Sequence, residues 1–362
     1  MGKKLAFFSS LLAVVLLTGA GCLNIGNEQD ISTSGPAGVF LSTDRGDTWV
    51  SVSAMPTNQG TKTLENMSVY SLFEDPQDAQ GLYWGSREGG LFYSFDSGKS
   101  WKQSGAPLNV SMIRSVTIHP NDKCSIFATN GRQMFRTTDC VRSWEEVFIE
   151  GRSDVSITEV AFDPFHPENL YMTESDGALL KSVDGGVHWA ILNTFKGYAR
   201  SVVFDSNKEG LMFVTTLKNG LFRSRDFGET WTDLSLKLKE YTGALDYRRF
   251  LVYPGQAEEI FWISKYGILT SRNSGEEWEP VKLVTPPGSV DIYSFSVSRT
   301  NDSEMYYTST NDVKKSTFYR TVDGGQNWET RKLPSKQIPT VLYSHPDNDG
   351  WIYLGFTIPP KN

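Results

Sequence analysis

The octapeptide STDRGDTW, residues 42–49, ends in a tryptophan, and its pattern returns six more times along the chain. The later copies are SFDSGKSW (94–101), TTDCVRSW (137–144), SVDGGVHW (182–189), SRDFGETW (224–231), SRNSGEEW (271–278) and TVDGGQNW (321–328). Successive tryptophans are 42 to 52 residues apart. A period of this length is typical of a repeat architecture, in which similar units pack side by side.

Each repeat contains four short apolar runs. One run precedes the octapeptide, as GVFLS (38–42) does, and another begins at its tryptophan. Two more stand earlier in the interval, for instance ITEVAFDP (157–164) and NLYMTE (169–174). Short aliphatic and aromatic runs bounded by Gly, Asn and Pro are strand signals, and no helical period is visible. We therefore expect four strands per repeat, named a to d from the inside outwards, with the octapeptide as the c–d turn.

Seven such units predict an all-β fold, a seven-bladed β-propeller of four-stranded antiparallel blades spanning residues 38–359. The chain enters at strands c and d (38–52) and leaves at strands a and b (339–356). The N- and C-terminal strands therefore share one blade. This pairing closes the ring and removes its open sheet edges.

The octapeptides are expected to be structural. The Asp carboxylate can accept backbone N–H groups, the Gly can take a positive φ, and the Trp ring covers apolar surface. These positions are Asp44, Asp96, Asp139, Asp184, Asp226, Asn273 and Asp323, with Trp49, Trp101, Trp144, Trp189, Trp231, Trp278 and Trp328. We assign no catalytic residue among them, because a turn repeated in every unit serves the fold.

The pattern S-x-D-x-G-x-T-W resembles the Asp-box, or BNR repeat, over the whole span from Ser42 to Trp328. Three copies depart from it, with Val141 for Gly, Asn273 for Asp, and His188 before the Trp. The box occurs in photosystem II assembly and stability factors, sortilin-type receptors, xyloglucanase-type glycoside hydrolases and sialidases. In length the chain resembles the assembly-factor family best, which implies a protein-binding propeller. Sortilin-type propellers are similar repeat by repeat but have more blades.

The resemblance to the enzyme families is weaker. Xyloglucanases use two propellers with the substrate cleft between them, and this chain is too short for two. Sialidases need an arginine triad, a Tyr–Glu pair and an opening Arg-Ile-Pro motif, whereas QIPT (337–340) lacks the Arg. We therefore expect no enzyme. A cell-surface propeller that binds or cleaves glycans is the alternative.

One column of residues predicts a binding surface. The column holds one residue from strand a of each repeat, six positions before the turn that ends the strand. Its members are Tyr70, Arg114, Thr158, Arg200, Arg248, Tyr293 and Thr340. Strand a lines the channel, so its arginines and tyrosines would ring one mouth of that channel. Arg binds carboxylates and Tyr stacks, which favours an acidic or C-terminal segment of a partner protein, or a carbohydrate. Alternatively, the arginines satisfy strand-end carbonyls or pair with neighbours such as Glu159.

The N-terminus predicts export. Two lysines precede an apolar run at 5–17, which is too short to span a bilayer, and TGAGC then ends at Cys22. This sequence resembles a bacterial lipobox, although Gly19 stands where Leu is usual. We expect a signal peptide at 1–22, a lipid on Cys22 that anchors the protein outside the cytoplasm, and a flexible tether at 23–37. Secretion is the alternative.

Composition and the remaining motifs restrict the partners. The net charge of −7 argues against nucleic-acid binding. His119, His166 and His345 fall in a–b turns of different blades, so we expect no metal site, and no cofactor motif is present. Cys124 and Cys140 lie at the same end of one predicted hairpin and form either a disulfide or two free thiols. These features together predict a non-catalytic, lipid-anchored scaffold or assembly factor.

Overall fold

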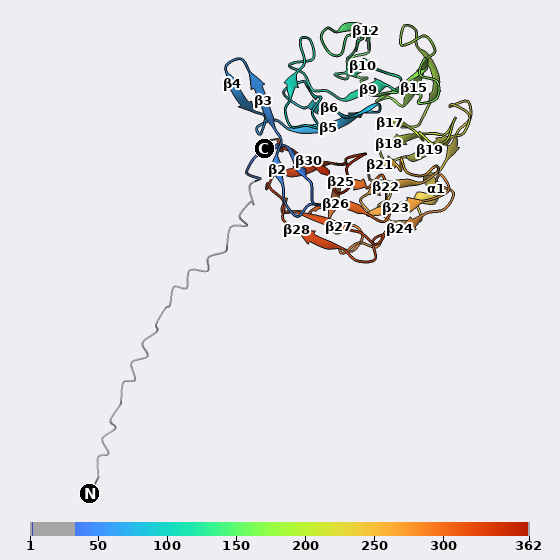
Figure 1. Ribbon diagram of the computed structural model, residues 1–362. Coiled ribbons are helices and arrows are strands. Elements are labelled where there is room, and N and C mark those ends of the chain that lie inside the picture. The colour runs from blue at the N-terminus through green and yellow to red at the C-terminus, as the bar shows by residue number, and fades with distance from the viewer. Residues whose placement is uncertain (1, 3–32, 361–362) are drawn as a thin grey trace.

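Seven four-stranded antiparallel sheets stand around a central channel in the computed structural model, which describes residues 2 and 33–360 (Figure 1). This arrangement confirms the predicted seven-bladed propeller. The predicted signal peptide, Cys22 and most of the predicted tether lie outside the described residues.

Six blades follow one another along the chain, each running from strand a at the channel to strand d at the rim. Blade 1 holds β5 (Val69–Asp75), β6 (Asp78–Ser86), β7 (Leu91–Ser94) and β8 (Lys102–Gln103), and blade 2 holds β9 (Ser115–His119), β10 (Asp122–Thr129), β11 (Gln133–Thr137) and β12 (Glu145–Ile149). Blade 3 holds β13 (Ile157–Phe162), β14 (Leu170–Glu174), β15 (Ala178–Ser182) and β16 (Ala190–Thr194), and blade 4 holds β17 (Ala199–Phe204), β18 (Met212–Thr216), β19 (Gly220–Ser224) and β20 (Thr232–Asp233). Blade 5 holds β21 (Tyr247–Val252), β22 (Ile260–Ser264), β23 (Ile268–Ser271) and β24 (Glu279–Pro280), and blade 6 holds β25 (Asp291–Val297), β26 (Met305–Thr310), β27 (Ser316–Thr321) and β28 (Glu329–Arg331).

Blade 7 closes the ring with strands from both ends of the chain, as predicted. Its order is β2 (Val50–Ser51), β1 (Gly38–Ser42), β30 (Ile352–Thr357) and β29 (Ile338–Ser344). β1 pairs with β30 over five residues, from Gly38 opposite Phe356 to Ser42 opposite Ile352. Because β30 also pairs with β29, this one strand joins the N-terminal pair to the C-terminal pair.

The octapeptides form the c–d turns through one repeated set of hydrogen bonds. In the first copy, Thr48 donates its N–H to Asp44 Oδ1 (2.8 Å) and its hydroxyl to Asp44 Oδ2 (2.6 Å), and Gly46 N–H donates to Ser42 Oγ (2.7 Å). These donors stabilise the ionised carboxylate. In the third copy, the Ser143 hydroxyl and backbone N–H hold the pKa of Asp139 at about 2.

The octapeptide also packs adjacent blades together. A Cβ on Gly46 would lie 2.4 Å from the Phe318 ring of blade 6, and a Cβ on Gly186 would lie 2.8 Å from the Phe127 ring of blade 2. The buried Trp101 of blade 1 donates its indole N–H to the Val52 carbonyl of blade 7 at 2.6 Å. The hydrophobic clusters accordingly lie between neighbouring blades rather than in one common centre.

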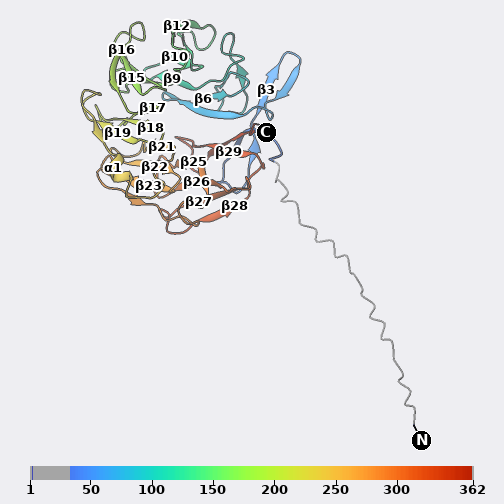
Figure 2. The ribbon, with the colours of Figure 1, turned by 180° about the vertical axis from the view of Figure 1, so that it is seen from behind.

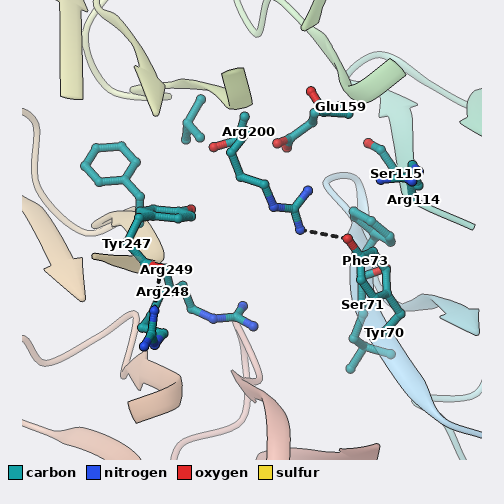
Figure 3. A pocket seen from close by; sticks show the side chains of 15 residues that line it. Tyr70, Ser71, Phe73, Arg114, Ser115, Glu159, Arg200, Tyr247, Arg248 and Arg249 are labelled. Atoms are coloured by element: carbon teal, nitrogen blue, oxygen red, sulfur yellow. Dashed lines mark hydrogen bonds between the residues drawn. The ribbon is translucent and has the colours of Figure 1, made fainter. Parts of the chain in front are cut away.

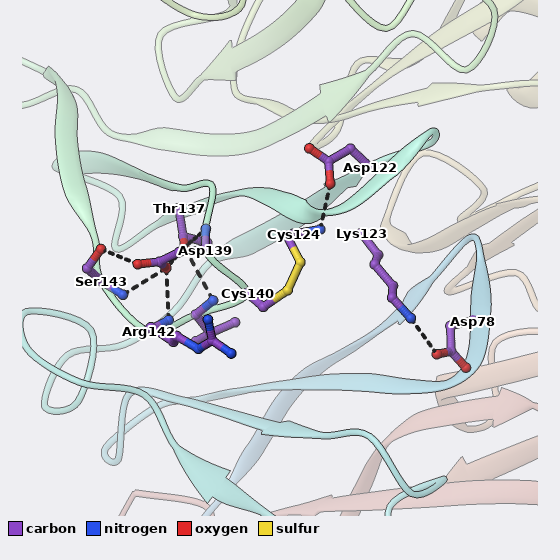
Figure 4. Close-up of a disulfide and its surroundings, with 10 residues drawn as sticks. Asp78, Asp122, Lys123, Cys124, Thr137, Asp139, Cys140, Arg142 and Ser143 are labelled. Carbon is purple, nitrogen blue, oxygen red and sulfur yellow. Dashed lines mark hydrogen bonds and ion pairs between the residues drawn. A yellow bond between two sulfur atoms is a disulfide. The ribbon is translucent and has the colours of Figure 1, made fainter.

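The third octapeptide differs because Val141 occupies the Gly position at φ 69°, a conformation that β-branched residues rarely adopt. The preceding residue, Cys140, is joined to Cys124 of the neighbouring strand by a disulfide (Figure 4). Val141 is buried in the cluster between blades 1 and 2. The covalent bond therefore lies beside the turn in which the usual glycine is missing.

The antiparallel order places the b–c loops and the d–a connections on one face, called the mouth face here, and the octapeptides and a–b turns on the other, called the turn face. Two d–a connections on the mouth face are long. One contains the hairpin of β3 (Ala54–Thr57) and β4 (Gly60–Thr63), which projects from the ring (Figure 2). The other contains the short helix α1 (Ser235–Leu238).

Candidate functional site

A cavity of about 200 Å³ lies in the channel where the a strands of blades 1 to 5 begin (Figure 3). Its lining includes four arginines, Arg114, Arg200, Arg248 and Arg249. Glu159 is the one carboxylate among the lining residues. The site therefore carries an excess of positive charge inside a protein whose net charge is −7.

The predicted mouth column coincides with a repeated β-bulge. In six of the seven a strands the register with strand b skips the column residue, namely Tyr70, Thr158, Arg200, Arg248, Tyr293 and Thr340. In blade 2, Arg114 stands just before β9 and its N–H donates to the Thr129 carbonyl at 2.9 Å. A bulged residue leaves the regular alternation of the strand, so its side chain can take a new direction.

Tyr70 and Arg200 meet across the mouth. Arg200 Nη2 donates to Tyr70 Oη at 2.9 Å, and the Arg200 guanidinium lies 5.8 Å from the centre of the Tyr70 ring (Figure 3). Arg87, from the b–c loop of blade 1, lies 5.5 Å from the same ring centre. Two guanidinium groups thus approach the Tyr70 ring. The contact with Tyr70 holds Arg200 in the channel, and the Arg200 guanidinium keeps further N–H donors for a ligand.

Arg114 is half-buried against Gly131 of the adjacent b–c loop, where a Cβ would lie 2.4 Å from Arg114 Nε. Within residues 33–360 its guanidinium makes no hydrogen bond or ion pair that meets standard distance criteria. It is therefore free to bind an anion.

Arg248 and Tyr293 are tied into an ion-pair cluster instead. Arg248 donates from Nη2 and Nε to Asp291 Oδ1 at 2.9 and 3.2 Å, and Tyr293 donates its hydroxyl to Asp291 Oδ2 at 3.3 Å. Lys265 Nζ lies 3.8 Å from the same carboxylate. Glu159 is the acid predicted beside the mouth from the sequence, and Asp291 is a second one that was not predicted.

Thr158 and Thr340 belong to the channel wall. The Thr158 hydroxyl is fully buried and donates to the Thr173 carbonyl at 3.0 Å. The Thr340 hydroxyl donates to the Val69 carbonyl at 3.0 Å, which links blade 7 to blade 1. The column therefore divides into side chains that enter the mouth and side chains that hydrogen-bond within the channel wall, either inside one blade (Thr158) or between two (Thr340).

The position after the bulge decides what else enters the channel. It is occupied by Ser71, Ser115, Glu159, Ser201, Arg249, Ser294 and Val341 in blades 1 to 7. Four serines leave space, so the two charged side chains extend into the cavity. Arg249 was missed by the sequence analysis, although the doublet Arg248–Arg249 within a strand was a signal that could have identified it.

Burial disfavours the charged forms of both Glu159 and Arg249. It raises the pKa of Glu159 to about 7, an effect that the nearby Arg200 guanidinium partly offsets. Burial also lowers the pKa of Arg249, whose Nη2 donates to the Thr340 carbonyl at 2.8 Å while its Nε has no partner. A buried guanidinium with an unused donor is suited to receive an anionic group from outside.

The far end of the channel holds a different cluster. Glu74 of blade 1 accepts hydrogen bonds from Arg299, which follows β25, and from the hydroxyl of Tyr343 in β29. Arg299 and Tyr343 belong to blades 6 and 7, so this carboxylate connects the first full blade to the last two. This cluster was not predicted from the sequence.

Within the described residues no group of three or more His, Cys, Asp or Glu side chains is arranged to hold a metal ion. The helices that the structure describes are also too short to cross a lipid bilayer.

The comparisons with known proteins agree with this fold. The model of the sortilin–Vps10 family, described as "Sortilin, neurotensin receptor 3", matches residues 89–180. The vacuolar protein sorting/targeting protein 10 of Aspergillus fumigatus is 33% identical over 78 residues, which cover 21% of this chain and 5% of that protein. A xyloglucanase of a Paenibacillus species is 28% identical over 247 residues, which cover 54% of this chain and 23% of that enzyme. The chain thus spans under a quarter of these relatives.

Solved structures extend the likeness over most of the chain. The GH74 xyloglucanase of Xanthomonas campestris aligns with a TM-score of 0.64 and 17% identity, covering 86% of this chain and 52% of that one. YCF48 of Cyanidioschyzon merolae aligns at 0.58 and 16%, covering 80% and 95%. YCF48 bound to D1 peptide aligns at 0.59 and 16%, covering 90% and 99%. The chain is therefore a seven-bladed propeller that resembles the photosystem II assembly-factor and sortilin-type propellers.

Proposed function

We propose that this chain is a non-catalytic propeller that captures an acidic segment of a partner protein at the mouth of its channel. The observation that carries the proposal is the set of guanidinium groups of Arg114, Arg200 and Arg249 around one cavity with a single lining carboxylate. Arginine binds carboxylates through two parallel hydrogen bonds, and partial burial strengthens them by excluding water.

The dimensions suit a side chain or a chain terminus. A cavity of about 200 Å³ is smaller than the 300–1,000 Å³ or so that is usual for drug-sized ligands. Tyr70 and Tyr247 in the lining offer aromatic surface to the rest of a peptide. The likeness to YCF48 bound to D1 peptide supports peptide binding, because that structure aligns over nearly the whole of both chains.

The test uses the full chain and a short fluorescent oligoglutamate peptide, with its amidated form and an oligolysine peptide for comparison. Arg200→Gln should weaken oligoglutamate binding by at least about tenfold, because one charge-assisted hydrogen bond contributes about 1.5–3 kcal/mol. Arg272→Gln is the matched control, because Arg272 is 70% exposed on the turn face. Equal affinities of both variants and the parent chain would end the proposal.

Glycan binding or cleavage is the second candidate, supported by the likeness to GH74 xyloglucanases. Glycoside hydrolysis generally uses two carboxylates about 5–9.5 Å apart. The cavity lining offers Glu159 as its one carboxylate, and Asp291, which contacts the lining residue Arg248, is already bound by that guanidinium, so the geometry favours binding over hydrolysis. Release of reducing sugar from xyloglucan by the parent chain, abolished in Glu159→Gln, would establish the second candidate instead.

We also propose that the protein works outside the cytoplasm on a lipid anchor at Cys22. The lipobox-like TGAGC sequence supports this part of the proposal. Cys22→Ser should release the protein from the membrane fraction of its bacterial host. Labelling with a radioactive fatty acid should disappear in the same variant. Continued fatty-acid labelling would contradict the assignment of the modified residue.

A further inference from the structure

The mouth face is divided into two halves of different charge. The loops of blades 4, 5 and 6 on this face are residues 217–219, 234–246, 265–267, 281–290, 311–315 and 332–337. They contain nine lysines, no arginine and only three carboxylates, Glu240, Asp246 and Asp312. The mouth-face loops of blades 7, 1, 2 and 3 that the structure describes contain six basic and five acidic residues. The positive excess is therefore concentrated on one side of the ring.

The lysines of this side are available to a ligand. Eight of the nine are exposed, and they come from five of the six loops: Lys218, Lys237, Lys239, Lys282, Lys314, Lys315, Lys332 and Lys336. The ninth, Lys265, is half-buried beside Asp291. Within the described part of the chain, none of the eight lies in an ion pair.

Exposed apolar side chains stand next to these lysines. Leu217 precedes Lys218, Leu236 in α1 precedes Lys237, and Val313 precedes Lys314. Leu236 is 69% exposed and Val313 is 50% exposed. Figure 1 shows α1 at the rim, close to β19 and β22. Single apolar residues at loop tips, each beside a lysine, suit insertion between lipid headgroups.

The chain also enters the propeller at this side. Lys336 donates its N–H to the Ser34 carbonyl at 3.1 Å, and Gln337 Nε2 donates to the Gly35 carbonyl at 3.2 Å. Residues 34–38 therefore join the ring beside the lysine-bearing loop 332–337.

We propose that the lysine-rich half of the mouth face, formed by the loops of blades 4 to 6, docks on an anionic lipid bilayer. This docking goes beyond peptide capture and does not depend on it, because the lysines lie outside the channel cavity. A bilayer fits better than an acidic protein, since the charges are lysines spread over six loops with apolar tips between them, and no arginine provides bidentate contacts. The docked molecule would present its channel mouth toward the membrane.

The first experiment measures orientation. The full chain carrying Cys22→Ser receives an environment-sensitive fluorophore at Val313→Cys or, as the matched control, at Val322→Cys. Both valines belong to blade 6, and Val322 is 59% exposed on the turn face. On vesicles of phosphatidylglycerol and phosphatidylcholine, the probe at 313 should shift to the blue and be quenched by headgroup-labelled lipid. The probe at 322 should not respond. Equal responses at the two sites would overturn the proposal.

The second experiment measures charge dependence. Lys218→Glu, Lys237→Glu and Lys314→Glu together should reduce vesicle binding by about a hundredfold or more, because each lysine near an anionic surface contributes about fivefold. The control is Lys99→Glu, Arg142→Glu and Lys208→Glu, which makes the same change in charge at exposed positions of the turn face. Binding to pure phosphatidylcholine at the same strength would contradict electrostatic docking.

Two further outcomes separate this docking from other events. Arg200→Gln should weaken oligoglutamate capture by at least about tenfold and leave vesicle docking intact, so failure of one proposal is visible apart from the other. A probe response that requires native membranes, and is missing on pure lipid vesicles, would overturn lipid docking and indicate a membrane protein as the partner.

Discussion

At the residue scale, Glu159 is the group whose charge state matters most to the candidate site. It faces the cavity between Thr158 and Arg200, and burial raises its pKa to about 7. In the unfolded chain the carboxyl ionises near its ordinary value of about 4.3. The folded protein therefore binds one more proton than the unfolded chain between these pH values, so Glu159 makes stability fall as pH rises through that window.

Glu159→Gln should raise the free energy of unfolding at pH 8 by up to about 3 kcal/mol and leave it nearly unchanged at pH 4. The physical reason is that Gln carries no charge to bury, while Glu must ionise above pH 7. Urea unfolding of both proteins across this pH range checks the prediction. A constant difference at all pH values would show that the carboxyl titrates normally.

The same substitution should strengthen oligoglutamate binding at pH 8, because an ionised Glu159 repels the ligand's carboxylates. At pH 5.5 the two proteins should bind alike, since Glu159 is then protonated. Fluorescence anisotropy at the two pH values measures this difference. A stronger effect at pH 5.5 would reverse the assigned sign and reject the role.

At the element scale, the octapeptide turn is a unit whose positions depend on one another. In the sixth copy Asn273 replaces the Asp, and its Nδ2 donates to Glu277 Oε2 at 3.3 Å. The other copies have Thr, Ser, His or Asn where Glu277 stands. The two departures therefore compensate, because an Asp at 273 would face the Glu277 carboxylate.

Asn273→Asp alone should destabilise the protein by about 1 kcal/mol through repulsion of two carboxylates. Asn273→Asp combined with Glu277→Thr should recover that loss, because the Thr hydroxyl donates to the Asp as in the first copy. Unfolding free energies of the four proteins in this cycle give the coupling. Additive effects would show that the two positions are independent.

The turn of blade 2 is held by a bond that the other blades lack. Cys124→Ser with Cys140→Ser should lower the free energy of unfolding by about 3 kcal/mol, since the disulfide closes a loop with a sequence separation of 16 residues. This loss of unfolding free energy should be larger than for a disulfide beside an unstrained turn, because Val141, next to Cys140, holds a positive φ. Urea unfolding under oxidising and reducing conditions checks this, and a double variant as stable as the oxidised parent would contradict it.

At the scale of the whole molecule, closure of the ring depends on β30. It lies between β1 and β29, and Glu74 of blade 1 receives Arg299 and Tyr343 from the blades on the other side of the closure. The two ends of the ring are therefore joined by non-covalent contacts, and we expect the seven blades to unfold as one cooperative unit.

Deletion of residues 352–362 should abolish the single cooperative unfolding transition, because β29 would lose the strand it pairs with and β1 would keep only β2. Deletion of residues 359–362 is the control, since it leaves β30 (Ile352–Thr357) and the hydrogen bond from Ile358 N–H to Ser68 intact. Denaturant unfolding followed by circular dichroism and tryptophan fluorescence measures both. A cooperative transition in the longer deletion would show that closure is dispensable.

The sequence by itself determined the number of blades, the position of each turn and the shared closing blade. These features are local: a strand, a turn and a tryptophan recur with one period, and each copy needs only its neighbours. The same reasoning placed Arg114, Arg200 and Tyr70 at the mouth, because a column of residues at one point of strand a must face one place in the ring.

Only the tertiary structure decided what these side chains do there. At the bulges, the side chains of Thr158 and Thr340 hydrogen-bond within the channel wall. Arg248 of blade 5 pairs with Asp291 of blade 6. Arg249 reaches the cavity because serines at the same level in four other blades leave room for it. Such outcomes depend on groups from different blades meeting across the channel, at distances that no single repeat specifies. Charge balance and burial at the mouth are therefore properties of the closed ring.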